Sequence, residues 1–374
     1  MNGFRLGSIF GFTIRIDFSW FIVFFLILWT FAMGVYPATV PGLSRSAYFV
    51  MGITTTLFFF ASLLTHEISH SVVARSKGIP VEGITLFIFG GMAQTRGEAE
   101  SPRDEFLIAG VGPLTSLVLA LVFGGLFMIG GEIGFGAGGL AVLRHLAVLN
   151  VTIAVFNLLP GFPLDGGRLF RAALWKITGD LTRATRIASR AGSGFGLLLV
   201  ALGIWQTFTV SPIGGLWLVF IGWFLHNAAM SGYQQHVLHD VLRRANAREV
   251  MTRNPETVPP GISLEAVMSD FFLRRRFVAY PVTSNGKPIG MITLHQVREV
   301  PLIEWPKRSV RDTMLPLSNE IVVRPSDTVL RVMDGLKASP SRRVLVLEND
   351  ELVGIISPAD VTAWLERARL SKPK

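Results

Sequence analysis

Residues 48–70 read YFVMGITTTLFFFASLLTHEISH, and this stretch decides how the chain folds. Its first part, residues 48–64, is apolar enough to cross a bilayer as a helix. It ends in three ionisable side chains, His66, Glu67 and His70. Because ionisable groups at membrane depth are costly, those that occur there usually have a function. The sequence therefore predicts a membrane helix that carries a functional polar group.

The spacing of the two histidines indicates a metal site. On a helix, His66 and His70 lie about 40° apart around the axis, so both imidazoles face one way. Two such imidazoles can bind one metal ion, and Glu67 beside them can take a proton from a metal-bound water. This H-E-x-x-H pattern is typical of zinc peptidases, but here it stands in an apolar span.

A catalytic zinc needs a third protein ligand and an open position for water. The chain has no cysteine, so disulfides and thiolate ligands are excluded. Asp165 is the best candidate, because the two glycines that follow it let the backbone turn the carboxylate inward. Asp165 could instead cap a helix that begins near Gly167. Weaker candidates lie in polar loops and are Glu82, Glu98, Glu100, Asp104 and Glu105.

The composition is that of a membrane protein with an added soluble part. Half of the 374 residues are hydrophobic and the mean hydropathy is +0.48, with the apolar residues concentrated before about residue 235. The net charge is +9, and basic residues are in excess in both halves. We interpret this excess as attraction to an anionic membrane surface. No nucleic-acid-binding motif is present, so we expect no nucleic-acid partner.

Six apolar segments are candidates for membrane helices. The segment at residues 145–159 is short and ends in Pro and Gly, which favours an incomplete span, and the next segment is also short. Basic residues after the second and fourth segments predict, by the positive-inside rule, that both termini are cytoplasmic. No cleavage site follows the first run, so we expect an uncleaved signal anchor. The six segments are 18–35, 48–74, 106–129, 145–159, 192–208 and 213–230.

Three stretches interrupt the helical pattern. Residues 81–95 contain β-branched and aromatic runs around Gly90 and Gly91, which predicts a β-hairpin at the membrane face. Residues 157–167 contain two prolines and three glycines, which exclude a regular helix. Irregular backbone at this depth is tolerated only where it lines a cavity or is covered by protein. The Gly-rich residues 130–139 are expected to form an external loop.

The chain after His239 contains two copies of one unit, at residues 248–300 and 311–370. Each copy has an amphipathic helix, at 264–273 or 329–338, and closes on a strand, a turn and a strand. A period of about 60 residues indicates a tandem domain rather than a solenoid. We therefore expect a membrane domain at 1–235, a linker at 236–247, and two α/β domains at 248–305 and 306–370.

Three motifs of residues 1–235 resemble those of the intramembrane site-2 proteases. They are His66-Glu67-Ile68-Ser69-His70, Ala109-Gly-Val-Gly-Pro-Leu, and Asn157-Leu-Leu-Pro-Gly-Phe-Pro-Leu-Asp165-Gly-Gly-Arg168. The repeated unit is similar to a pair of CBS domains. The segment Gly354-Ile-Ile-Ser357-Pro-Ala-Asp360 resembles the closing segment of such domains. Together the motifs favour the CBS-bearing branch of the family, which includes the sporulation proteases.

This resemblance implies a polytopic α-helical membrane protein that binds one Zn²⁺ and cleaves a membrane-anchored protein in or near a transmembrane helix. The implied metal ligands are His66, His70 and Asp165. Glu67 is the implied general base, and Asn157 is implied to orient the substrate or to stabilise the oxyanion.

The CBS pair implies regulation by an adenine nucleotide such as ATP, and a homo-oligomer formed through the pair is a further expectation. Ser357 and Asp360 match the positions that contact the nucleotide in such pairs. The first copy has Thr293 and Gln296 there. A glutamine where aspartate is usual argues against one of the two nucleotide sites.

Other classes of function remain open at this point. In a CBS-gated ion transporter, His66, Glu67, His70 and Asp165 would line an ion pathway. An inactive scaffold of the protease fold is a further alternative, against which the complete ligand set argues. A second metal site at His236 and His239 is a weaker hypothesis, since these histidines are expected near the membrane interface.

Overall fold

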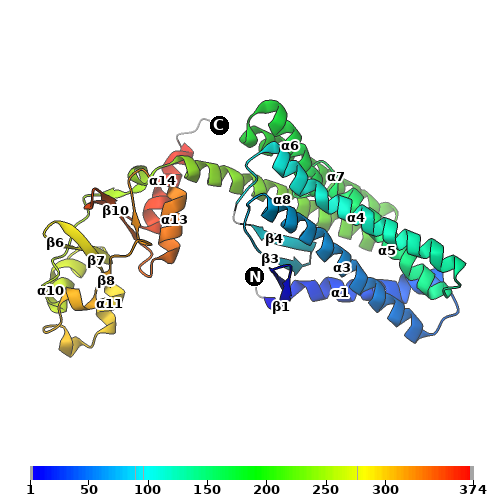
Figure 1. Ribbon diagram of the computed structural model, residues 1–374, viewed down its shortest axis with the longest axis horizontal. Coiled ribbons are helices and arrows are strands. Elements are labelled where there is room, and N and C mark those ends of the chain that lie inside the picture. Colours follow the sequence, from blue (N-terminus) through cyan, green and yellow to red (C-terminus); the bar gives the residue numbers. More distant parts are fainter. Residues whose placement is uncertain (1–2, 89, 96, 276, 371–374) are drawn as a thin grey trace. The chain divides into compact units, whose positions relative to one another are not determined.

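The computed structural model describes residues 3–88, 90–95, 97–275 and 277–370 (Figure 1). The chain divides into two units, Met1–His236 and Val237–Lys374. The first unit combines long helices with one small sheet, and the second unit is an α/β structure.

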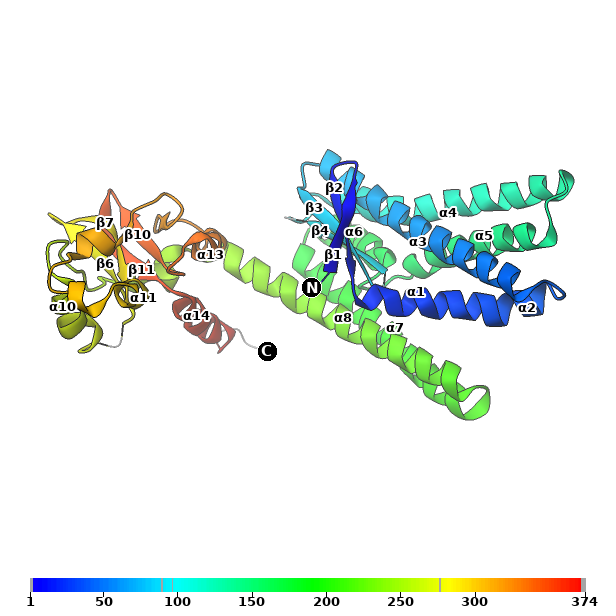
Figure 2. The same cartoon turned by 90° about the horizontal axis from the view of Figure 1, so that it is seen from below.

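Within the described residues, six helical segments are long and apolar enough to cross a membrane. Neighbouring members pack side by side, as α3, α4 and α5 do (Figure 2). The first segment is α1, which continues through a π-turn (η1, Thr30–Val35) into α2. This confirms the predicted polytopic α-helical fold. The segments are α1 Ser19–Trp29 with α2 Tyr36–Thr39, α3 Arg45–Ser76, α4 Pro102–Glu132, α5 Ala137–Asn157, α7 Leu181–Thr209 and α8 Pro212–Arg244.

The prediction of an incomplete fourth span is wrong. Helix α5 begins at Ala137 rather than at residue 145, and it is long enough to cross. Its first turn contains Gly138, where a Cβ atom would lie 3.1 Å from Sδ of Met51 on α3. Small residues let membrane helices approach closely, so glycines here belong to a helix and not to a loop.

The predicted bounds of the external loop and of the short fifth span are also wrong. Helix α4 continues through Gly130 and ends at Glu132, so only residues 133–136 connect it to α5. Helix α7 begins at Leu181 rather than at residue 192, because the Asp180 side chain accepts a capping hydrogen bond from the Arg183 N–H at 3.0 Å.

A four-stranded sheet packs against α3. Its order is β1-β2-β3-β4, with Gly3–Ile9, Phe12–Asp17, Val81–Phe87 and Gly90–Thr95 as the strands. β3 and β4 are antiparallel and form the predicted hairpin, in which Phe89 lies outside the described residues. β2 pairs with β3 in parallel. β4 is therefore an edge strand of this sheet among the described residues.

The N-terminal hairpin of β1 and β2 was not predicted. Phe12, Ile14 and Ile16 are buried while the residues between them are not, which is the alternation of a half-buried strand. Phe12 and Ile14 pack with Ile84 of β3 and with Leu64 and Ile68 of α3. This packing fixes the hairpin β3–β4 beside the part of α3 that carries the histidines.

The second unit confirms the tandem α/β pair. The two copies exchange short strands: β5 of the first copy pairs with β11, and β8 of the second copy pairs with β7. The predicted helix 264–273 is present as α10 and a π-turn, η2. The strands are β5 Thr252–Arg253, β6 Ala279–Ser284, β7 Lys287–Thr293, β8 Leu315–Pro316, β9 Val322–Val323, β10 Val344–Glu348 and β11 Glu351–Ile356. The helices are α9 Ala247–Val250, α10 Leu264–Val267, η2 Met268–Phe272, α11 Leu294–Glu299, η3 Leu302–Glu304, α12 Val310–Thr313, α13 Val329–Ala338 and α14 Pro358–Leu370.

Candidate active site

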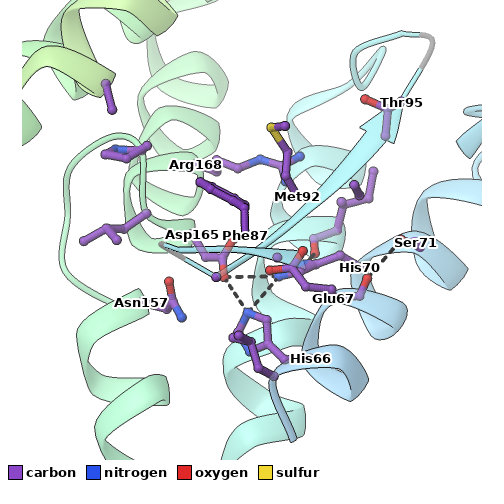
Figure 3. Close-up of a pocket in the computed structure, with 18 of the residues that line it drawn as sticks. His66, Glu67, His70, Ser71, Phe87, Met92, Thr95, Asn157, Asp165 and Arg168 are labelled. Carbon is purple, nitrogen blue, oxygen red and sulfur yellow. Dashed lines mark hydrogen bonds and ion pairs between the residues drawn. The ribbon is translucent and has the colours of Figure 1, made fainter. Parts of the chain in front are cut away.

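The structure brings His66, His70 and Asp165 together at one point (Figure 3). Oδ2 of Asp165 lies 3.1 Å from Nε2 of His66 and 3.1 Å from Nε2 of His70, and the two Nε2 atoms are 3.2 Å apart. Ligand atoms at the corners of a zinc tetrahedron, with bonds of about 2.0–2.1 Å, stand about 3.3 Å from one another. The three donor atoms therefore fit a zinc ion.

The outer nitrogens of both rings also suit a metal site. The Nδ1–H of His70 donates to the carbonyl oxygen of Ile108 at 2.5 Å, which leaves Nε2 with a free lone pair. Nδ1 of His66 is 2.9 Å from Oγ of Ser116, which can likewise accept a hydrogen bond from the Nδ1–H. Metal-binding histidines are usually oriented by such contacts. Both rings are nearly buried, with 2% and 6% of their surface exposed.

A short irregular segment brings Asp165 to the histidines. It follows the end of α5 at Asn157 and leads into α6, Asp165–Thr178. A Cβ atom at Gly166 would overlap the carbonyl of Leu158, and one at Gly167 would lie 2.6 Å from the carbonyl oxygen of Gly161. The backbone can thus return on itself only with glycine at these positions. The start of α6 has no side-chain capping hydrogen bond, so the alternative role of Asp165 as a cap is wrong.

Glu67 and Asn157 line the same cavity as the three donors (Figure 3). The cavity measures about 770 Å³, and β4, α4, α6 and α8 contribute to its walls. This volume is in the range of ordinary ligand pockets. Glu67 lies against the backbone of β4, because a Cβ atom at Gly91 would be 2.9 Å from the Glu67 Cδ. The site thus combines three metal donors, a carboxylate and an extended edge strand.

The weaker ligand candidates lie outside the three-donor group, although Glu98 and Glu105 also line the cavity. Oε1 of Glu105 accepts hydrogen bonds from Arg168 and Arg171, and Oδ1 of Asp104 is 2.9 Å from Nζ of Lys77. Oε2 of Glu98 is 3.3 Å from Nδ1 of His236. Among the described residues, the one group of three side chains with metal-ligand spacing contains none of the other candidates, nor His236 with His239.

Sequence reasoning missed three contributors to this site. Gly91, Gly112 and Ser116 approach or contact Glu67 or the histidines. Gly112 stands in the Ala109-Gly-Val-Gly-Pro-Leu motif, which was noted only as a likeness. Its role follows from the helix packing, which the motif by itself does not reveal.

The two copies of the second unit differ at the matched positions. Asp360 Oδ2 accepts from the Ser357 N–H at 2.8 Å and from its hydroxyl at 2.6 Å, and Asp360 Oδ1 accepts from the Thr252 hydroxyl at 2.9 Å. In the first copy, Oε1 of Gln296 accepts a hydrogen bond from the Thr293 N–H at 2.8 Å, and Nε2 of Gln296 donates to the carbonyl of Thr313 at 2.8 Å.

Comparisons with known proteins agree with these two parts of the chain. The model of peptidase family M50 matches residues 54–134 and 128–199, and the model of the CBS domain matches residues 247–302 and 310–367. A solved structure, the site-2 protease from Methanocaldococcus jannaschii, is 26% identical with a TM-score of 0.44, covering 62% of this chain and 94% of that one.

Curated relatives are similar over nearly the whole chain. Rip3 of Mycobacterium tuberculosis, named as a zinc metalloprotease, is 37% identical over 99% of this chain and 94% of its own length. The zinc metalloprotease MJ0392 of Methanocaldococcus jannaschii is 30% identical over 82% of this chain and 83% of its own. The chain therefore belongs to peptidase family M50, the site-2 proteases, as a multi-pass membrane zinc metalloprotease with a C-terminal pair of CBS domains.

Proposed function

We propose that this protein cleaves a membrane-anchored protein in or near a transmembrane helix, as an intramembrane zinc endopeptidase. One observation carries the proposal. The three donor atoms of His66, His70 and Asp165 meet 3.1–3.2 Å apart in a cavity beside a carboxylate, and two of them belong to an apolar helix that can span a membrane. We assign the proteolysis to residues 1–235 and regulation to the domains at 248–305 and 306–370, joined by the linker at 236–247.

The side chains around the donors have separate roles. A zinc ion held by His66, His70 and Asp165 would polarise the scissile carbonyl and lower the pKa of a bound water to about 7. Glu67 would act as the general base that takes a proton from the attacking water and returns it to the leaving amine. Asn157, which lines the cavity, can donate from its amide to the substrate carbonyl.

The test of the metal site is the zinc content per chain of the detergent-purified protein. We expect one zinc in the wild type and little or none in His66→Ala and in Asp165→Ala, because each change leaves two protein donors. His145→Ala is the matched control, since Nδ1 of His145 donates to the Ala141 carbonyl oxygen at 2.7 Å and its ring packs against Phe31 and Tyr36, outside the three-donor group. Well-folded wild type without zinc would overturn the proposal and favour the ion transporter.

The substrate is held as an added strand on β4. β4 is an edge strand of the sheet and lines the cavity with Gly90, Gly91, Met92 and Ala93. An extended peptide that pairs with such an edge exposes its carbonyls in a regular row, which a helix does not do. The strand lies against Glu67 at Gly91, so a bound peptide would pass close to the general base.

The substitution Gly91→Ala tests this close approach. Its Cβ would overlap Cγ of Glu67, so we expect kcat to fall roughly 10- to 100-fold through displacement of the base. Zinc content should stay at the wild-type level, because no metal donor is touched. Gly7→Ala is the control, since nothing lies within 4 Å of a Cβ at that position in β1. Equal turnover in Gly91→Ala and wild type would contradict the placement of Glu67.

An adenine nucleotide such as ATP regulates the protease through a single site per chain. Asp360 and Ser357 can hold ribose hydroxyls, and Arg343 is available for phosphate. Burial lowers the pKa of Arg343, and the nearby Asp360 carboxylate raises it. Gln296 already bonds to Thr313, and Leu315 stands in the first copy where the second site has Thr252.

Calorimetry on the full chain checks the stoichiometry. We expect one ATP per chain, with binding weakened roughly 10-fold or more in Asp360→Asn because a charged acceptor is lost. Gln296→Leu is the matched change in the first copy and should leave ATP binding unchanged. Two equivalent ATP sites, or binding that is lost in Gln296→Leu, would overturn the assignment.

We also propose that both termini lie in the cytoplasm. Six spans are an even number, which puts the two ends on one side of the membrane, and the basic loops favour the cytoplasmic side.

A further inference from the structure

Helix α4 carries a stripe of buried residues that all face the metal site. Glu105, Ile108, Gly112 and Ser116 are spaced three or four residues apart, so they share one face of the helix. Glu105 and Ser116 have 1% and 0% of their surface exposed. Helix α4 packs against both α3, which carries the histidines, and α6, which carries Asp165. We call these four residues the α4 stripe.

The α4 stripe contacts both histidine rings at Nδ1, the ring nitrogen that does not meet Asp165. The Nδ1–H of His70 donates to the Ile108 carbonyl oxygen at 2.5 Å, and Nδ1 of His66 is 2.9 Å from the Ser116 hydroxyl. Gly112 lies between these two contacts along the helix. A Cβ atom there would be 2.6 Å from Nε2 of His66 and would overlap Nε2 of His70. The missing side chain therefore lets α4 come close enough for both contacts.

The same stripe holds α6 at its other end. Oε1 of Glu105 accepts from Nη2 of Arg171 at 2.6 Å and from Nε of Arg168 at 3.0 Å. Arg168 follows Asp165 by one helical turn. A buried carboxylate shared by two guanidinium groups holds its partners firmly, because its charge would be unpaired in the interior if both arginines moved away. Glu105 thus fixes the start of α6.

We propose that the α4 stripe positions the metal ligands, with Ser116 positioning His66 and Glu105 positioning Asp165 through Arg168 and Arg171. The inference rests on the proposed zinc site. Ser116 contacts Nδ1 of His66, whereas Nε2 is the donor atom, and Glu105 lies outside the three-donor group, so both act through the ligands and not on the metal. Loss of such an outer partner typically weakens metal binding roughly 10- to 100-fold.

Zinc affinity of the full chain in detergent, measured by competition with a chelator, is the main readout. The absorption spectrum of the Co²⁺-loaded protein is the second, since it reports coordination geometry. We expect Ser116→Ala and Glu105→Gln to bind zinc roughly 10- to 100-fold more weakly and to change the Co²⁺ spectrum. Ser116→Thr retains the hydroxyl and should restore the affinity, which loss of packing alone would not predict.

Neighbouring residues of the same helix supply matched controls. Thr115→Ala removes a hydroxyl that bonds only within α4, to the Val111 carbonyl at 2.8 Å. Asp104→Asn removes a carboxylate that pairs with Lys77. Both should keep wild-type zinc affinity. Glu105→Asp keeps the charge between the arginines but shortens its reach, so it tests the geometry if Glu105→Gln does not fold.

The outcomes separate this inference from the zinc site itself. Wild-type affinity and an unchanged Co²⁺ spectrum in Ser116→Ala and in the folded Glu105 variant would overturn the role of the stripe and leave the site standing. Equal weakening in the controls would also overturn it, because the effect would then be general destabilisation. Wild type without zinc would instead refute the proposed function.

Discussion

Replacing Glu67 by glutamine is expected to lower kcat by roughly 10²- to 10⁴-fold while one zinc stays bound per chain. Glutamine keeps the size of the side chain that lines the cavity, so the cavity should keep its shape. It cannot accept the proton of the attacking water, and general-base catalysis is lost. Glu67 is outside the three-donor group, so metal binding does not depend on it.

Two measurements on the same preparation check this expectation: zinc content per chain, and cleavage of a membrane-anchored model substrate in detergent or vesicles. Glu132→Gln, at the exposed end of α4, is the control for an acid-to-amide change and should cleave normally. Loss of zinc in Glu67→Gln would make Glu67 a ligand. Undiminished hydrolysis would place the general base elsewhere.

The substitution Gly112→Ala is expected to weaken zinc binding by roughly 100-fold or more, by analogy with the loss of a ligand's supporting contact and with direct displacement added. Its methyl group would overlap Nε2 of His70 and lie 2.6 Å from Nε2 of His66, and these are the two atoms that meet Asp165. Alanine is favoured over glycine inside a helix by about 1 kcal/mol, so α4 itself should not be weakened.

Chelator competition and thermal unfolding together test Gly112→Ala. A cooperative unfolding transition of the metal-free protein would show that it still folds, while the zinc affinity falls. Gly124→Ala lies in the same helix with nothing within 4 Å of the added Cβ, so it should bind zinc like the wild type. Normal zinc binding by Gly112→Ala would mean that α4 does not pack as closely on the histidines as described.

The three-donor group of His66, His70 and Asp165 was predictable because its signals are local. Two histidines four residues apart in an apolar run, and an aspartate before a glycine pair, each indicate their chemistry from neighbouring residues alone. Asp165 was chosen by elimination among acidic residues, and its distance to the histidines is a result of the fold. The number of membrane helices was predictable for a similar reason, since length and hydropathy suffice.

The supporting residues were not predictable, because their roles depend on which helices meet. Ser116 and Gly112 resemble any small residues in a membrane helix until α4 is seen against α3. The start of α5 was misplaced because glycine was taken as a sign of loop, whereas here it lets helices approach. The start of α7 was misplaced because Arg183, Arg186 and Arg190 were taken as part of a basic loop. The strands β1 and β2 are short, and their core is formed with β3 and α3, far along the chain.

The order of the donors along the chain has a consequence for biosynthesis. Asp165 follows His70 by 95 residues, and Glu105 and Ser116 lie between them. At a translation rate of about 5–20 residues per second, Asp165 leaves the ribosome roughly 5–20 s after His70. During this interval the growing polypeptide holds two of its three donors. We therefore expect no zinc-dependent cleavage by the growing chain before Asp165 has been made.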